Sequence, residues 1–192
     1  MRHGEPLRVG PGADARDPAL SPRGLRQVAA AAGQVIADGF DVLYASPLRR
    51  ALQSAGVIAE RTGAEIHVEE GLAEFDHKVE YLHYEDGADI WARYRAGDLT
   101  PWGTTLQEFQ DRVLDAVERL ADAHPGRHVL AVCHGGVINV VANHVMGVTD
   151  RVQLFPPVYA STSRFERDDQ GTWHVRSLNE TTLPAELLVV PA

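Results

Sequence analysis

The hydrophobic positions of this chain follow two alternating periods, one typical of helices and one typical of strands. Ser21 and Pro22 form a favoured helix start. The apolar residues that follow recur at helical spacing, at Leu25, Val28, Ala29, Ala32 and Ile36. The β-rich run DVLYA comes next, and a second Ser-Pro start precedes another apolar stripe at Leu48, Leu52, Ala55 and Ile58. This order predicts a helix, a strand and a second helix that ends at Gly63.

The later part of the chain repeats this alternation. AEIHVEE alternates as a strand does, and Thr105 with Glu108 forms a capping box that predicts a helix to about Ala123. A buried strand is predicted at RHVLAVC, and a helix that ends at Gly147 is predicted at HGGVINVVANHVMG. Two strands around an Asp-Gln-Gly turn are predicted at ASTSRFERDDQGTWHVRSLN. Helices that alternate with short apolar strands predict a three-layer α/β domain with a mostly parallel sheet.

Residues 75–103 follow neither period. Aromatic and charged side chains are mixed there without a clean repeat. We expect an irregular, lid-like excursion over the surface of a single domain that spans residues 1–192. No internal repeat, low-complexity segment or linker divides the chain.

Composition limits the classes of function. The chain has 192 residues, 44% of them hydrophobic and 23% charged, which is the balance of a globular protein with its own core. Its apolar runs are too short or too polar to cross a bilayer, and no basic-then-apolar leader precedes RHGEP, so we expect a cytoplasmic protein. A net charge of −9 disfavours nucleic acid and anionic membranes as partners. The single cysteine, Cys133, leaves no intrachain disulfide and no cysteine metal cluster.

Basic residues gather where the strands are predicted to end. ASPLRR follows DVLY, CHGG follows HVLAV, and RHGE would follow a first strand if one preceded it. Ligands of open parallel sheets bind beyond the carboxyl ends of the strands, so we expect one basic pocket there. It would collect Arg2, His3, His134 and either Arg49 or Arg50. The helix that begins at Gly135 would offer N–H groups to an anion, and the sequence therefore predicts a phosphate site.

The residue types in this pocket suit phosphoryl transfer. A histidine between guanidinium groups can attack a phosphoryl group and form a phosphohistidine. Arginines match phosphate oxygens as planar forks and stabilise the charge of the transferring group. The leaving alkoxide needs a proton from a carboxylic acid, and Glu74, which follows AEIHVEEGLA, is the best placed candidate.

Each residue also has a purely structural interpretation when taken alone. Arg2 and His3 would form a disordered terminus, the two arginines of ASPLRR a solvated helix face, and His134 a helix cap or a core histidine. Glu74 has several acidic neighbours, and each of them would equally be a surface charge: Glu5, Glu69, Glu70 and Asp76. The joint occurrence of the motifs favours the phosphate site.

The joint pattern resembles the histidine phosphatase superfamily, in its phosphoglycerate mutase-like branch. The similar segments occur in the family's order over nearly the whole chain: RHGEP, LSPRGLRQV, YASPLRRALQSA, GLAEFD, VLAVCHGGVINVV and LNETT. The resemblance implies His3 as the phosphate-accepting nucleophile, Arg2 and Arg50 as phosphate ligands, His134 as the second pocket histidine and Glu74 as the proton donor. Consecutive helix residues point about 100° apart, so Arg49 is expected to face substrate or solvent instead.

Two segments depart from the family pattern. After GLAEFD the chain continues with HKVEYLHYEDG, where the family often has a Gly-containing segment, and this implies an altered lid. The apolar strand that usually precedes RHG is also missing. We therefore expect that the natural protein begins upstream of Met1 and that His3 lies on a frayed terminus with no strand to aim it.

These features predict a metal-independent phosphomonoesterase that acts on a small phosphorylated metabolite through a phosphohistidine and needs no cofactor. A mutase that returns the phosphoryl group to another hydroxyl is the first alternative, disfavoured because the chain lacks a longer substrate-holding insert. A phosphate-binding pseudoenzyme is the second. A metal hydrolase is disfavoured because no His-x-x-x-His or His-Glu-x-x-His pair lies at a suitable helical spacing. A homodimer is left open.

Overall fold

The computed structural model describes residues 1–10, 12–83 and 86–189. Its central sheet has three parallel strands in the order β2-β1-β3. They are β1 (Val42–Ala45), β2 (Ile66–Val68) and β3 (Val129–Val132). A separate antiparallel pair joins β4 (Thr162–Arg167) to β5 (Trp173–Glu180). The prediction of a mostly parallel sheet is confirmed, and so is the late hairpin.

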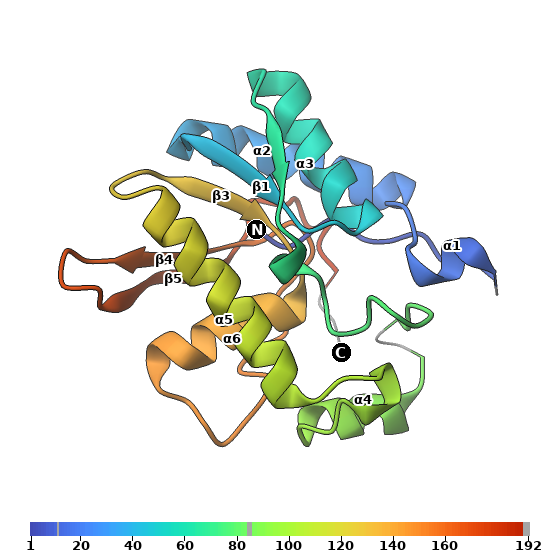
Figure 1. Ribbon diagram of the computed structural model, residues 1–192. Coiled ribbons are helices and arrows are strands. Elements are labelled where there is room, and N and C mark those ends of the chain that lie inside the picture. The colour runs from blue at the N-terminus through green and yellow to red at the C-terminus, as the bar shows by residue number, and fades with distance from the viewer. Residues whose placement is uncertain (11, 84–85, 190–192) are drawn as a thin grey trace.

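Helices cover both faces of this sheet, as Figure 1 shows. One face carries α2 (Pro22–Asp38) and α3 (Arg49–Thr62), and the other carries α5 (Leu106–Ala123) and α6 (Gly135–Met146). Side chains of β1 alternate between the two faces: Leu43 and Ala45 pack in the cluster of α2 and α3, and Tyr44 packs against the cluster of α5 and α6. The three-layer α/β architecture is therefore confirmed. None of the helices in the described ranges is both long and apolar enough to cross a membrane.

The stretch 75–103 is more regular than its sequence predicts. It contains α4 (Ala88–Arg95) and the 3₁₀ turn η2 (Thr100–Trp102); the other short elements are α1 (Ala13–Arg16) and the 3₁₀ turn η1 (Glu70–Leu72). Four aromatic residues of residues 75–103 are buried in the core: Phe75, Trp91, Tyr94 and Trp102. The rings of Phe75 and Tyr94 stack with centroids 4.8 Å apart. Helix α4 has only eight residues, which is too few to show a clear hydrophobic period in the sequence. Tertiary contacts decide which of its residues are buried. The role of this stretch as a lid stays a prediction.

Helix α2 begins as predicted, and its predicted stripe is confirmed at Val28 and Ala32 but not at every position. The Ser21 hydroxyl accepts a hydrogen bond from the Gly24 N–H at 2.9 Å and so caps the helix. The expected stripe is wrong at Leu25, which is 44% exposed, and at Ala29, which is also exposed. Small residues form much of the packed face instead, because α2 lies in close backbone contact with the segment that follows His3.

The first three residues pair with β3. The Met1 amino group donates to the Ala131 carbonyl at 2.7 Å, and the Cys133 N–H donates to the Met1 carbonyl at 2.8 Å. The His3 N–H donates to the Cys133 carbonyl at 3.0 Å, which completes a parallel bridge between Arg2 and Cys133. Residues 1–3 thus lie beside the end of β3 and are joined to it by a single parallel bridge.

The opposite edge of this short segment is also held. The Arg2 N–H donates to the Ser161 carbonyl at 2.9 Å, and the Ala160 N–H donates to the His3 carbonyl at 3.1 Å. His3 is consequently only 2% exposed. The expectation of a frayed terminus is wrong, because backbone hydrogen bonds fix this segment on both sides.

Two glycines allow α2 to touch the segment after His3. A Cβ atom on Gly24 would lie 2.1 Å from the Glu5 carbonyl oxygen, and one on Gly4 would lie 2.4 Å from the Gly24 carbonyl oxygen. Both contacts are to backbone, which cannot move aside as a flexible side chain does. The glycines of RHG and SPRG therefore fix the position of His3 relative to α2.

Gly24→Ala is expected to lower the free energy of unfolding by about 1–3 kcal/mol, because the added methyl group overpacks this contact. Any activity that depends on His3 should fall with it, since the backbone after His3 must shift. Gly33→Ala in the same helix is the matched control. A Cβ there meets nothing within 4 Å, so we expect stabilisation of about 0.5–1 kcal/mol. Denaturant unfolding checks both variants, and equal effects would contradict the account.

Candidate active site

A pocket lies beyond the carboxyl ends of β1 and β3. It is lined by Arg2, His3, Arg50, Glu74, Phe75, Asp76, Tyr81, Trp91 and Gly135. The His134 ring lies beside it, with its centroid 5.0 Å from that of His3. The structure therefore brings together all six residues that the sequence places in one site, although they come from four distant segments of the chain.

His3 is held as a neutral imidazole of one tautomer. Its Nδ1 lies 2.6 Å from the Gly4 carbonyl oxygen, which can only accept, so Nδ1 carries the proton. Burial, then the positive charges of Arg50 and Arg2, keep the pKa of His3 well below its ordinary value. The Nε2 atom of the neutral ring consequently keeps its lone pair, which is what a nucleophile requires.

Arg50 is the arginine of the pocket, and Arg49 is not. Arg50 is 1% exposed, whereas its neighbour Arg49 is exposed, in agreement with the helical period of α3. The Arg50 Nη2 atom lies 3.3 Å from Asp76 Oδ1, and the guanidinium lies over the ring of Tyr81, 4.6 Å from its centroid. Its Nε and Nη1 atoms are buried and have no hydrogen-bond partner among the described residues. Two donors of a fixed cation are therefore available to an anion.

Arg2 lines the same pocket as His3 and Arg50. Its guanidinium lies 4.0 Å from the centroid of the Tyr159 ring, and Nη1 donates to the Pro157 carbonyl. The side chain is 2% exposed. Two cations with aromatic support therefore line the pocket of the histidine, which is the charge arrangement expected for a phosphate site.

His134 precedes α6 and is oriented by Ser46, a residue that our sequence analysis did not single out. The His134 Nε2 atom lies 2.7 Å from Ser46 Oγ, and Ser46 is fully buried at the end of β1. Nδ1 of His134 is buried without a partner in the described ranges. Burial, followed by Arg50 and His3, keeps the pKa of His134 well below its ordinary value. The sequence feature that indicates Ser46 as a site residue is its position in ASPLRR, directly after the predicted strand.

The side-chain carboxyl group of Glu74 lies at the N-terminus of α6. Its Oε2 accepts the Gly136 N–H at 2.8 Å, and its Oε1 accepts the Phe75 N–H at 3.2 Å. A Cβ on Gly136 would lie 2.3 Å from Oε1, so this glycine makes room for the carboxyl group. Burial, then Asp76, raise the pKa of Glu74 to about 7. The expectation that α6 offers free N–H groups to an anion is therefore corrected: Glu74 occupies the one at Gly136.

The acidic neighbours of Glu74 separate into surface and pocket residues. Glu70 is exposed, and Glu69 Oε1 pairs with Arg119 on the surface at 2.8 Å. Asp76 is only 4% exposed and lines the pocket, so the interpretation of this residue as a surface charge is wrong. Sequence position alone does not distinguish these carboxylates, because burial depends on segments far away in the chain.

Arg112 on α5 holds the turn that leads into Glu74. Its Nη1 atom donates to the carbonyls of Gly71 at 3.0 Å and Ala73 at 2.8 Å, with a longer contact of 3.4 Å to Glu70. Sequence reasoning missed this residue, because an arginine on an amphipathic helix looks like an ordinary surface charge.

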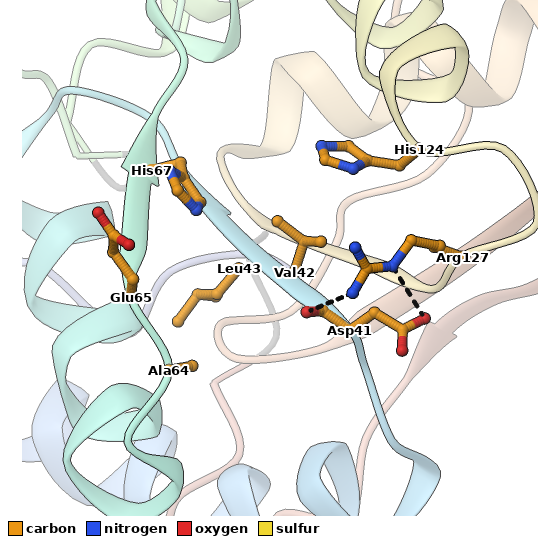
Figure 2. A pocket seen from close by; sticks show the side chains of 8 residues that line it. All are labelled: Asp41, Val42, Leu43, Ala64, Glu65, His67, His124 and Arg127. Carbon is orange, nitrogen blue, oxygen red and sulfur yellow. Dashed lines mark hydrogen bonds and ion pairs between the residues drawn. The ribbon is translucent and has the colours of Figure 1, made fainter.

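A second hollow opens at the opposite ends of the strands (Figure 2). It is lined by Asp41, Val42, Leu43, Ala64, Glu65, His67, His124 and Arg127. Figure 2 shows the Arg127 guanidinium turned toward Asp41, with the rings of His67 and His124 on separate walls. Within the described ranges no cluster of three histidine, cysteine or carboxylate side chains is placed to hold a metal ion. The paired cations and the nucleophile geometry occur only in the first of these two hollows.

Comparison with known proteins gives the same picture. The family model of the histidine phosphatase superfamily (branch 1) matches residues 1–181. A 2,3-bisphosphoglycerate-dependent phosphoglycerate mutase of Parvibaculum lavamentivorans is 31% identical over 172 residues, which cover 81% of this chain and 82% of that protein. The uncharacterized phosphatase PhoE of Bacillus subtilis is 28% identical over 83% of this chain and 81% of its own. The crystal structure of phosphoserine phosphatase from Entamoeba histolytica in complex with 3-phosphoglyceric acid superposes with a TM-score of 0.72 at 25% identity, covering 94% and 95% of the two chains.

Proposed function

The chain belongs to the histidine phosphatase superfamily (branch 1) and is an enzyme of hydrolase type, and we propose that it hydrolyses a small phosphorylated metabolite through a phosphohistidine at His3, without a metal. On the sequence grounds given above, we also propose that the protein is located in the cytosol, acts on a small molecule and needs no cofactor.

The observation that carries this proposal is the state of His3. The ring is buried and neutral, its Nδ1–H is held by the Gly4 carbonyl so that Nε2 keeps its lone pair, and the positive charges of Arg50 and Arg2 act on it in the same pocket. An attacking nitrogen needs that lone pair, and a phosphoryl group needs those cations. A histidine buried only for packing requires neither.

The pocket residues support a reaction in two steps. Nε2 of His3 attacks phosphorus, the ester P–O bond breaks, and the protonated Glu74 carboxyl gives its proton to the leaving oxygen. Water then attacks the phosphohistidine and gives its proton to the Glu74 carboxylate, while the P–N bond breaks and inorganic phosphate leaves. Arg2, Arg50 and His134 stabilise the charge on the three equatorial oxygens in both steps.

A mutase is the second candidate function, because one of the relatives above is a phosphoglycerate mutase. The two activities share the phosphohistidine and differ in its acceptor, which is water in one and a substrate hydroxyl in the other. Release of inorganic phosphate therefore distinguishes them.

The test uses 3-phosphoglycerate and p-nitrophenyl phosphate with the purified chain. We expect inorganic phosphate to be released at a rate that EDTA leaves unchanged and that vanadate lowers, because vanadate mimics the five-coordinate phosphorus. Conversion of 3-phosphoglycerate to an isomeric phosphate ester without release of inorganic phosphate would show that the protein is a mutase. Loss of activity in EDTA that Mg²⁺ restores would contradict the metal-independent mechanism. A lack of turnover with every ester in a phosphometabolite panel would identify a pseudoenzyme.

A further inference from the structure

One buried carboxylate of the pocket, that of Asp76, has no role in the two-step mechanism. Asp76 is 4% exposed, and its Oδ1 lies 3.3 Å from Nη2 of Arg50. The other carboxylate near Arg50 belongs to Asp17, which is 3.8 Å away with a side chain that is 41% exposed. A buried charge is costly unless it is paired, so a second carboxylate beside the proposed acid Glu74 calls for an explanation.

Resting on the proposed function, we propose that Asp76 is a positioning residue of the active site: it fixes the Arg50 guanidinium for phosphate binding and favours the protonated form of the neighbouring Glu74 carboxyl.

The first effect follows from the geometry of Arg50. A guanidinium is a rigid planar fork, so fixing one nitrogen limits where the others point. Asp76 engages Nη2, and the ring of Tyr81 lies against the guanidinium. Nε and Nη1 are left without a hydrogen-bond partner in the described part of the pocket. Asp76 therefore holds Arg50 through Nη2 and makes no hydrogen bond to Nε or Nη1. Nη1 also lies 3.8 Å from Asp17 Oδ1, beyond hydrogen-bond distance.

The second effect follows from two carboxyl groups that share one buried site. Two neighbouring carboxylates in low dielectric do not both ionise readily, and the one with the direct cation contact takes the negative charge. Burial raises the pKa of Asp76 as well, but the contact with Arg50 opposes this rise, so Asp76 takes the negative charge more readily than Glu74 does. In agreement, Asp76 is the second cause, after burial, that raises the pKa of Glu74.

Other charged or titratable groups also act on Glu74, and they come from several elements. They are Arg50 on α3, Arg112 on α5, Cys133 after β3 and the Gly136 N–H on α6, with Arg2, His3 and Tyr81 in the same pocket. His77 acts on Asp76. Asp76→Asn leaves all of these in place and removes one negative charge, so a change in the titration of Glu74 reports that charge.

The experiment is a ¹³C NMR titration of the Glu74 side-chain carboxyl, with its signal assigned by comparison with Glu74→Gln. Asp76→Asn is nearly isosteric and still offers an oxygen to Arg50. We expect the Glu74 midpoint to fall by about one pH unit, because an unfavourable like charge is removed. The alkaline limb of kcat/KM for 3-phosphoglycerate should move to lower pH by the same amount, since the acid must be protonated to act.

Asp17→Asn is the matched control, because it removes the other carboxylate near Arg50, and its Glu74 midpoint should stay at the wild-type value. Asp76→Glu keeps the charge and should also keep the midpoint high. An unchanged midpoint in Asp76→Asn, or an equal fall in Asp17→Asn or Asp76→Glu, would overturn the proposal.

Wild-type protein supplies a measurement that needs no variant to fold. Coupled groups titrate in two steps, so the Glu74 signal should show a second inflection from Asp76. A single inflection contradicts the proposal. The NMR midpoint does not depend on turnover, so this inference and the proposed function fail independently.

Discussion

His3→Ala is expected to lower the turnover of 3-phosphoglycerate and of p-nitrophenyl phosphate by about 10⁴-fold or more. His3 is the nucleophile of the proposed mechanism, and removal of a covalent nucleophile typically costs this much or more. Arg2, Arg50 and Glu74 would remain in the variant, but none of them replaces the Nε2 lone pair. The measurement is steady-state phosphate release with the folded variant.

His144→Ala is the control for this prediction. His144 lies on α6 and is exposed, so its removal should leave the rate and the fold unchanged. The turnover rate of His134→Ala should lie between those of these two variants, about 10²- to 10³-fold below the wild-type rate, because the change removes one donor to the transferring group. A His3→Ala protein that keeps a tenth of the wild-type rate would show that another group carries the reaction.

Arg50→Ala is expected to affect both activity and stability. Loss of one fixed phosphate donor costs about 10²- to 10³-fold in rate. The same change leaves the Asp76 carboxylate buried without its cation, which costs about 3–5 kcal/mol in the free energy of unfolding. Few substitutions in this chain combine both losses, because few residues bind an internal counterion and line the pocket at once.

Two variants separate these effects. Arg49→Ala, one position earlier and exposed, should change stability by no more than about 0.5 kcal/mol and leave turnover near the wild-type rate. Arg50→Ala with Asp76→Ala should regain much of the lost stability but none of the activity. If Arg49→Ala is the damaging change, the assignment of Arg50 to the phosphate is wrong.

Local signals in the sequence predict much of this protein correctly. Helix starts at Ser21 and Thr105 depend on hydrogen bonds within a few residues, and both caps form. The helical period predicts that only one of Arg49 and Arg50 faces the pocket, and the family resemblance identified that residue as Arg50. The parallel sheet then brings the ends of β1 and β3 together, and this is why motifs far apart in the chain meet in one pocket.

The features that sequence reasoning missed depend on distant parts of the chain. Asp76 is buried and pairs with Arg50, which lies 26 positions earlier in the chain. Arg112 donates to carbonyl groups that lie 39 to 42 positions earlier. The first residues look frayed in sequence, yet β3 and Ser161 hold them from both sides. No local period reports such contacts.

The most direct test of the central claim is a rapid-quench experiment with ³²P-labelled p-nitrophenyl phosphate. The account predicts a phosphoryl label that is stable in alkali and labile in acid, that maps to the peptide containing His3, and that is absent from His3→Ala. A label on His134 or on a serine, or phosphate release without any covalent label under single-turnover conditions, would contradict it.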